Sequence, residues 1–131
     1  MENTAQNPEN KAKSFTNLYV WQRAHEFVRE MYLLSEKFPK TEMYGLTSQL
    51  RRAAVSVPAN IAEGFGRNTL KDKLRFLTFS RGSLEECRYY LILANDINYA
   101  KTVDSLKQLE ELSKILSSSV EKLNNLYGNK N

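Results

Sequence analysis

The sequence predicts an all-α fold, an antiparallel up-and-down four-helix bundle, and three observations support this prediction. Apolar residues recur at spacings of three and four in four successive segments, which is the period of one helix face. No segment shows the alternation of apolar and polar residues between turns that marks a strand. The connections are short, and short connections favour antiparallel neighbours.

The 131-residue chain is long enough for one domain to bury most of its apolar surface. Residues 1–16 are polar, a composition that does not compensate the entropy of ordering. We therefore expect a flexible tail over residues 1–16 and one bundle domain over residues 17–128. No apolar run approaches the ~20 residues that span a bilayer, and the N-terminus lacks the apolar segment of a secretory signal. A cytoplasmic location without membrane contact is the expectation.

The first predicted helix runs from about Leu18 to Lys37, and Pro39 ends it by disfavouring helical geometry in the preceding residue. The second starts near Glu42 and ends at Gly64. Pro58 lies in its interior and removes one backbone hydrogen bond, so we predict a kink there. The alternative is a break of the helix at Ser56.

The third predicted helix begins at Thr69, because Thr69 and Asp72 resemble a capping box, and it runs to about Asn98. The fourth opens at Thr102 and closes near Gly128. The apolar face of each helix follows the helical period. In chain order these faces are Val20, Ala24, Phe27, Val28, Met31, Leu34 and Phe38; Leu46, Leu50, Ala53, Val57 and Ile61; Leu77, Ser80, Leu84, Cys87, Leu91 and Ala94; and Leu109, Leu112, Leu116, Ser119, Leu123 and Leu126.

The third helix carries a second apolar line beside the first, so its apolar face is wider than the ~100° stripe that a bundle helix usually needs. The members of this line are Phe76, Phe79, Tyr90, Leu93 and Ile97. Either part of this wide apolar face contacts another copy of the chain, in a closed homo-oligomer, or the aromatic residues fill a wide core. The sequence leaves both alternatives open.

Polar ridges flank the apolar faces of the second and third helices. The ridge residues are Gln49, Arg52, Ser56, Asn60 and Glu63 on the second helix, and Arg81, Glu85 and Arg88 on the third. Charges at a packing edge are tolerated when they are paired, so we expect the ridges to meet through Arg52 or Arg81 with Glu63 or Glu85. Gly82 and Ser83 would allow the close approach, and Arg51 would turn away from this edge.

Candidates for catalysis or metal binding are few. His25 is the only histidine, no Glu-x-x-His pair exists for a di-metal site, and we expect His25 to be a partly exposed residue near Trp21. Cys87 stands among apolar residues, which favours an inert core thiol. No metal, cofactor or catalytic residue is therefore expected.

Basic residues are concentrated in the middle of the chain. The net charge is +4, and the segment from Arg51 to Arg88 has eight basic and four acidic residues, so its surplus equals the whole net charge. The candidate contacts for a polyanion are Arg51, Arg67, Lys71, Lys73 and Arg75. A solvated helix start is the alternative for these cations. The Gly64-Phe65-Gly66 stretch could cradle a phosphate, but a plain helix-to-helix turn is favoured because no strand precedes it.

Six motifs stand along the chain: VWQRAH at 20–25, FP at 38–39, YGL at 44–46, QLRRA at 49–53, SVPANIAEG at 56–64 and RGSLEE at 81–86. Over about Leu18 to Leu126 they resemble the four-helix-bundle family of 23S rRNA intervening-sequence proteins. The resemblance implies a bacterial cytosolic protein that forms a ring of five bundles. It also extends to the accessory variability determinant of diversity-generating retroelements, a basic pentamer that engages a reverse transcriptase and nucleic acid. The family has no established catalytic residues.

The residues and the resemblance together indicate a non-enzymatic, oligomeric protein that binds or associates with nucleic acid, RNA or DNA, through its basic surface. The alternative is a protein-interaction scaffold, for example for a polymerase, without direct contact to nucleic acid. An enzyme ranks third, because no nucleophile, base and orienting group can be assembled from the residue types and spacings present.

Overall fold

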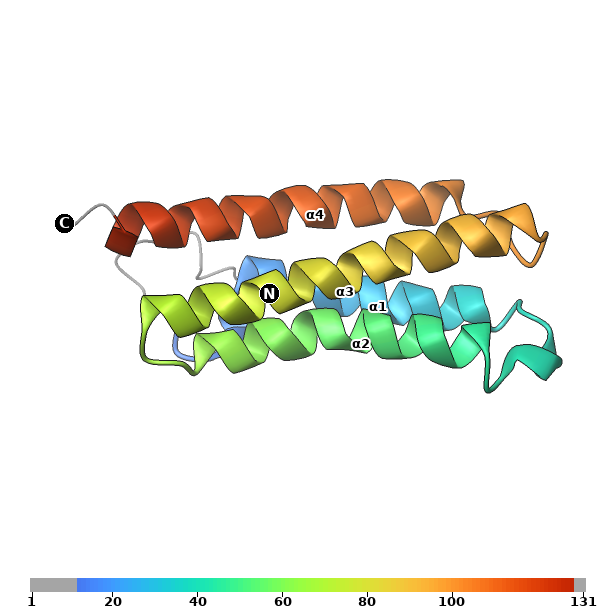
Figure 1. Ribbon diagram of the computed structural model, residues 1–131, viewed down its shortest axis with the longest axis horizontal. Coiled ribbons are helices and arrows are strands. Elements are labelled where there is room, and N and C mark those ends of the chain that lie inside the picture. The colour runs from blue at the N-terminus through green and yellow to red at the C-terminus, as the bar shows by residue number, and fades with distance from the viewer. Residues whose placement is uncertain (1–11, 129–131) are drawn as a thin grey trace.

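The computed structural model describes residues 12–128, which contain four long helices and no strand (Figure 1). The all-α prediction with four helices is confirmed. The helices are α1 (Tyr19–Ser35), α2 (Leu46–Phe65), α3 (Leu70–Asp96) and α4 (Val103–Leu123). Short helical turns occur at η2 (Phe15–Asn17) and η3 (Lys40–Glu42), and a π-helical turn, η4 (Asn124–Gly128), follows α4.

The four helices lie side by side, and consecutive helices run in opposite directions (Figure 1). The pair α2 and α3 has the most extensive contact, α1 packs on α2 and on α4, and α3 packs on α4. Most of the predicted tail, residues 1–11, lies outside the described residues. Nearer the bundle, Phe15 packs edge-on against Trp21 on α1 with ring centroids 5.2 Å apart.

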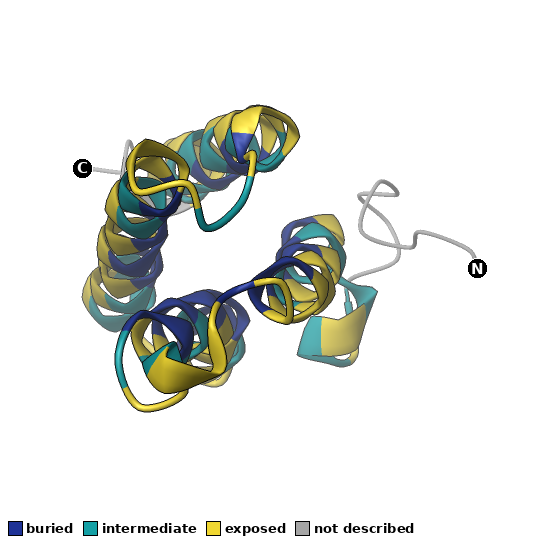
Figure 2. Ribbon diagram, turned by 90° about the vertical axis from the view of Figure 1, so that its right-hand side faces the viewer, coloured by how far each residue is buried: buried dark blue, intermediate teal, exposed yellow. Residues whose placement is uncertain are grey.

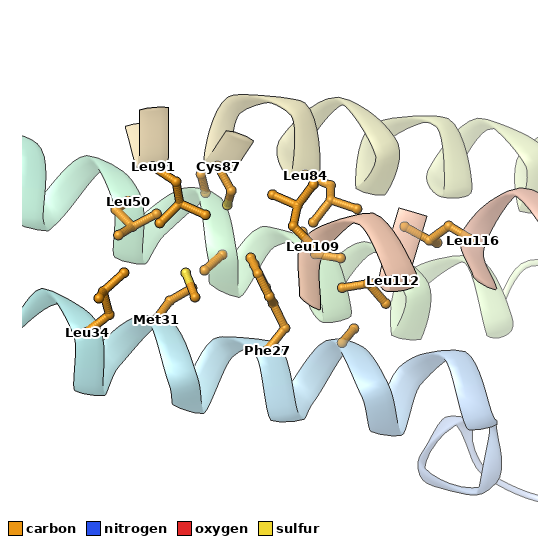
Figure 3. Close-up of a cluster of buried hydrophobic side chains, with 14 of the residues drawn as sticks. Phe27, Met31, Leu34, Leu50, Leu84, Cys87, Leu91, Leu109, Leu112 and Leu116 are labelled. Atoms are coloured by element: carbon orange, nitrogen blue, oxygen red, sulfur yellow. The ribbon is translucent and has the colours of Figure 1, made fainter. Parts of the chain in front are cut away.

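The core lies between the four helices, and the residues that the helical period predicts for it are almost all buried. Seen end-on, buried residues face the interior of the bundle and exposed residues face outwards (Figure 2). Figure 3 shows the contributions of α1, α2, α3 and α4 meeting in one cluster, with Phe27 at its centre. Val28 and Leu123 are only half-buried, and Leu126, which lies beyond the end of α4, is 60% exposed.

The second helix begins later than the sequence suggested. The prediction of a start near Glu42 is wrong, because residues 40–42 form a separate 3-10 turn and α2 begins at Leu46. The Glu42 carboxylate instead caps α2 from outside, since its Oε1 accepts a hydrogen bond from the Leu46 N–H at 3.1 Å. Its Oε2 accepts a 2.6 Å hydrogen bond from the Tyr99 hydroxyl in the α3–α4 connection. Glu42 therefore fastens two connections at one end of the bundle.

Replacing Glu42 by glutamine is expected to lower stability at neutral pH and to flatten its loss in acid. The hydrogen bond from Tyr99, and then that from the Leu46 amide, lower the pKa of Glu42 from its ordinary 4.5. A lowered pKa stabilises the folded state above the unfolded pKa, and this stabilisation is lost as pH falls through the folded pKa. Urea midpoints at about pH 7 and about pH 3 would measure it. Glu36→Gln, an exposed carboxylate change on the same connection, is the control; equal pH responses of the two variants would contradict the role of Glu42.

The helix α2 continues without interruption from Leu46 through Pro58 to Phe65. The alternative of a break at Ser56 is therefore wrong, while a kink at Pro58 stays a prediction. The start of α3 agrees with its predicted cap, because the Thr69 hydroxyl accepts a hydrogen bond from the Asp72 N–H at 3.1 Å.

The second apolar line of α3 lies at the edge of the core. Tyr90 and Leu93 are half-buried and pack against the core, Phe76 is half-buried, and Phe79 and Ile97 are 48% and 43% exposed. Tyr90 and Leu93 therefore widen the core, whereas Phe79 and Ile97 leave apolar surface exposed. Tyr89 and Ile92 add further exposed apolar surface to α3.

Candidate functional site

The turn from α2 to α3 brings the predicted basic residues to one corner of the bundle. Gly64 makes this turn tight: a Cβ atom at Gly64 would lie 3.1 Å from the Cβ of Phe76 and 3.4 Å from the carbonyl oxygen of Lys73. The glycine thus permits the close approach of α2 and α3 that the sequence assigned to Gly82. The first turn of α3 is held directly beside the end of α2.

Phe76 organises the cations at this corner. The guanidinium of Arg67 lies 4.7 Å from the centre of the Phe76 ring, and that of Arg75 lies 5.1 Å from it. Arg67 also pairs with Glu63 at 2.8 Å, and Arg75 pairs with Asp72 at 3.6 Å. The Nε atom of Arg67 is buried without a hydrogen-bond acceptor among the described residues. Both arginines are therefore oriented by an aromatic ring and a carboxylate while their side chains stay 40% and 54% exposed.

The Gly64-Phe65-Gly66 stretch is a helix-to-helix turn and offers no phosphate cradle. The N–H groups of Gly66 and Arg67 donate to the carbonyls of Glu63 and Gly64, each at 3.2 Å. The ammonium of Lys73 donates to the Phe65 carbonyl at 3.0 Å. These three donors are engaged within the turn, so they are not available to a bound anion.

The two remaining candidate cations differ in their surroundings. Lys71 is exposed and makes no ion pair within residues 12–128. Arg51 lies elsewhere, because its Nε donates to the Ser35 hydroxyl at 2.8 Å and its guanidinium stacks over the Tyr32 ring at 4.6 Å. Arg51 turns away from the α2–α3 edge, as expected, and contacts α1 instead. It joins α2 to α1, and the structure brings only Arg67, Lys71, Lys73 and Arg75 together.

The predicted ion pairs between the ridges are wrong. Glu63 pairs at 2.8 Å with Arg67, which lies just beyond the end of α2, and Glu85 pairs with Arg88 on α3 at 3.0 Å. A partner three or four residues away on the same helix face is within reach without any constraint from packing, so it outcompetes the partner across the interface. Arg88 also reaches α4, where its Nη1 lies 2.7 Å from Glu110, and hydrogen bonds to Glu85 and then to Glu110 raise the pKa of Arg88. Arg52, Arg81 and Gln49 are exposed; neither arginine is in an ion pair in the described part of the chain.

Small hydroxyl groups, which the sequence did not single out as bonding partners, join the ridges. The Ser83 hydroxyl donates to the Ser56 hydroxyl, and that of buried Ser80 donates to the Val57 carbonyl, each at 2.8 Å. The amide nitrogen of Asn60 donates to the carbonyl and hydroxyl oxygens of Ser56, both at 2.9 Å. A Cβ at Gly82 would meet no atom within 4 Å. The prediction that Gly82 allows close approach to α2 is therefore wrong.

The expectations for His25 and Cys87 are confirmed. His25 is exposed and its ring stacks on Trp21, with centroids 5.0 Å apart and planes at 8°. Cys87 is fully buried, and burial raises the pKa of its thiol to about 12, so the nucleophilic thiolate is suppressed. Across residues 12–128 no group of three or more His, Cys, Asp or Glu side chains could hold a metal ion. None of the described helices is both long and apolar enough to cross a membrane.

Comparison with known proteins finds one matching family model. A family model described as 23S rRNA-intervening sequence protein matches residues 16–118. The match includes α1, α2, α3, the basic corner and most of α4. No curated protein sequence matches the chain.

Proposed function

Because the chain belongs to the 23S rRNA-intervening sequence protein family, we propose that it is a non-enzymatic protein that associates with RNA through the α2–α3 corner. In this proposal the chain is an up-and-down four-helix bundle and works as a closed homo-oligomeric ring in the bacterial cytoplasm. The resemblance noted above implies five subunits. The exposed apolar residues Tyr89, Ile92 and Ile97 on α3 support contact with a further copy.

The observation that carries the proposal is the cluster of four cations on the first turns of α3 and the end of α2. Two carboxylates, Glu63 and Asp72, lie in the same corner and pair with the two arginines. The four cations are Arg67, Lys71, Lys73 and Arg75. A cation–π contact and an ion pair orient each guanidinium while leaving it accessible. Contacts of this kind go to phosphates, so binding should depend strongly on salt and weakly on sequence.

Neutralising the corner by changing Arg67, Lys71, Lys73 and Arg75 together to alanine is expected to reduce affinity for RNA and to lower its salt dependence. With four phosphate contacts to a single strand, the slope of log affinity against log salt should fall by up to about 2.8. Fluorescence anisotropy with a labelled RNA at several salt concentrations measures both quantities. Unchanged affinity and slope would contradict the proposal.

Two further variants sharpen this experiment. Changing Lys37, Lys40, Lys101 and Lys107 to alanine removes the same charge from exposed residues on other parts of the chain, and this control should keep the salt slope nearly intact. A double variant at Lys71 and Arg75 avoids the partly buried Arg67 and should lose about half of the effect, with thermal unfolding recorded to confirm the fold.

A second candidate function, a protein-interaction scaffold, is favoured by a trough of about 340 Å³ on the outer face of α1. It is lined by Trp21, Gln22, His25 and Leu33, by the carboxylates Glu26 and Glu30 and by the guanidinium of Arg29. Apolar surface beside charges of both signs suits a polypeptide better than a nucleic acid. A protein partner that stays bound after nuclease treatment, with no affinity of the chain for RNA, would favour this function.

A further inference from the structure

A shallow groove of about 450 Å³ runs along the outer side of the α2–α3 contact, adjoining the basic corner. Ser56 and Asn60 of α2 and Phe79, Gly82, Ser83 and Glu86 of α3 line it. Its volume falls within the ~300–1,000 Å³ of sites for small molecules. The basic corner uses none of these residues.

One wall of the groove is an aromatic ring held in a fixed orientation. Phe79 is 48% exposed, and Phe76 contacts it edge-to-face with ring centroids 5.6 Å apart and planes at 88°. Phe76 is itself fixed by the guanidinium groups of Arg67 and Arg75. The groove therefore presents an oriented, accessible ring, on which a flat aromatic group can stack.

The floor of the groove carries no side chain at Gly82. A Cβ atom there would meet nothing within 4 Å, although a glycine weakens the middle of a helix such as α3. No side chain of the described residues fills the space next to Gly82. A glycine at such a place lets a planar ligand lie close to the backbone.

Most of the polar atoms that remain available in the groove are hydrogen-bond acceptors. The amide nitrogen of Asn60 and the hydroxyl of Ser83 already donate to Ser56. The amide oxygen of Asn60 is therefore free to accept, and the Ser56 hydroxyl keeps its own hydrogen to donate. The Thr78 hydroxyl donates to a carbonyl of its own helix at 2.9 Å. The Glu86 carboxylate accepts only one long hydrogen bond, 3.5 Å from the Tyr90 hydroxyl, within the described residues. The groove thus matches a flat ligand whose edge donates hydrogen bonds.

The groove and the basic corner lie along one face of α3. Arg75 precedes Phe79 by four residues, which places it about 6 Å further along the same side of the helix. Lys71 lies another four residues before Arg75. A strand that leaves the groove along α3 would pass two cations in succession.

We propose that the groove binds one unpaired RNA base with an exocyclic amino group, which is present on adenine, cytosine and guanine but not on uracil, while Arg75 and Lys71 hold the adjoining phosphates. This inference rests on the proposed association with RNA. Unpaired bases are recognised by stacking on aromatic side chains and by hydrogen bonds to their edges, and a carboxylate suits an exocyclic amine. A helix of a second copy would be a different occupant of the groove, and the native mass of the groove variants distinguishes it from RNA.

The test uses the full chain and labelled oligo(A), oligo(U) and duplex RNA of about 12 nucleotides. Phe79→Ala and Gly82→Leu are each expected to weaken oligo(A) binding at least about fivefold, since stacking of one base contributes that much or more. Duplex binding should change less than about twofold, because its phosphates still meet the basic corner. Tyr44→Ala, which removes an aromatic ring that is 93% exposed and lies outside the groove, is the control and should keep oligo(A) binding.

A second readout separates recognition from loss of structure. The wild type should prefer oligo(A) to oligo(U), and Glu86→Gln should bring this ratio closer to one without weakening duplex binding.

Unchanged oligo(A) affinity in both groove variants, while neutralising the corner still reduces binding, would overturn base binding in the groove and leave the RNA association standing. No RNA affinity in the wild type would overturn both. A lower native mass of the Phe79→Ala or Gly82→Leu variant would also overturn the proposal, because the groove would then be a contact between copies.

Discussion

Replacing Phe27 by alanine is expected to lower the free energy of unfolding by about 3–5 kcal/mol. The Phe27 ring has no exposed surface and lies where α1 meets the other helices in the core (Figure 3). The loss combines the transfer free energy of the ring with the cost of the cavity left behind. Since domains of this size have stabilities of about 5–15 kcal/mol, the variant should lose a large part of its stability. Urea denaturation followed by circular dichroism measures the change.

Phe79→Ala is the matched control for this prediction, because it removes the same side chain from a surface position that is 48% exposed. Its cost should stay below about 1 kcal/mol, as for surface substitutions in general. Similar losses in both variants would contradict the assignment of Phe27 to the core and of Phe79 to the surface.

Gly64→Ala is expected to destabilise the protein by about 1–2 kcal/mol. The added methyl group would lie 3.1 Å from the Phe76 Cβ and 3.4 Å from the Lys73 carbonyl oxygen. Both atoms are fixed to the backbone of α3, so the helix itself must shift. Overpacking of this kind costs about 1–3 kcal/mol, which outweighs the gain of up to about 1 kcal/mol when alanine replaces glycine in a helix. Thermal unfolding monitored by circular dichroism gives the sign.

Gly82→Ala, on α3, is expected to have the opposite effect on stability. Because its Cβ would meet no atom within 4 Å, only the helix propensity changes, and the variant should be more stable by up to about 1 kcal/mol. A destabilised Gly82→Ala variant would contradict the open space at this position. Measured together, the two variants locate the close approach of α2 and α3.

The core could be predicted from the sequence because burial follows the helical period. Leu50, Ala53, Val57 and Ile61 occupy one face of α2, and all four are buried. The period does not fix where a helix starts. The start of α2 depends on Glu42 and on Tyr99, which is 57 residues away, and no local pattern reveals such a partner.

The candidate site was predictable in its location but not in its contacts. The charge surplus pointed to Arg67, Lys71, Lys73 and Arg75, and the α2–α3 turn does bring them to one corner. The helix register does not determine the ion pairs of the ridges. Each carboxylate lies within reach of an arginine close by in the sequence as well as of one across the interface. Arg51 reached Ser35 for a related reason. Long side chains extend well beyond the face on which their backbone lies.

The hydrogen bond between Tyr99 and Glu42 also bears on the order in which the protein folds. It joins the α1–α2 and α3–α4 connections, whereas residues 66–69 link α2 to α3 through the chain itself. A contact between residues 57 positions apart requires closure of a long loop, which costs more chain entropy than pairing adjacent helices. The α2–α3 hairpin can therefore form early from local contacts. The Tyr99–Glu42 contact should then form after this hairpin, when the α1–α2 and α3–α4 connections come together.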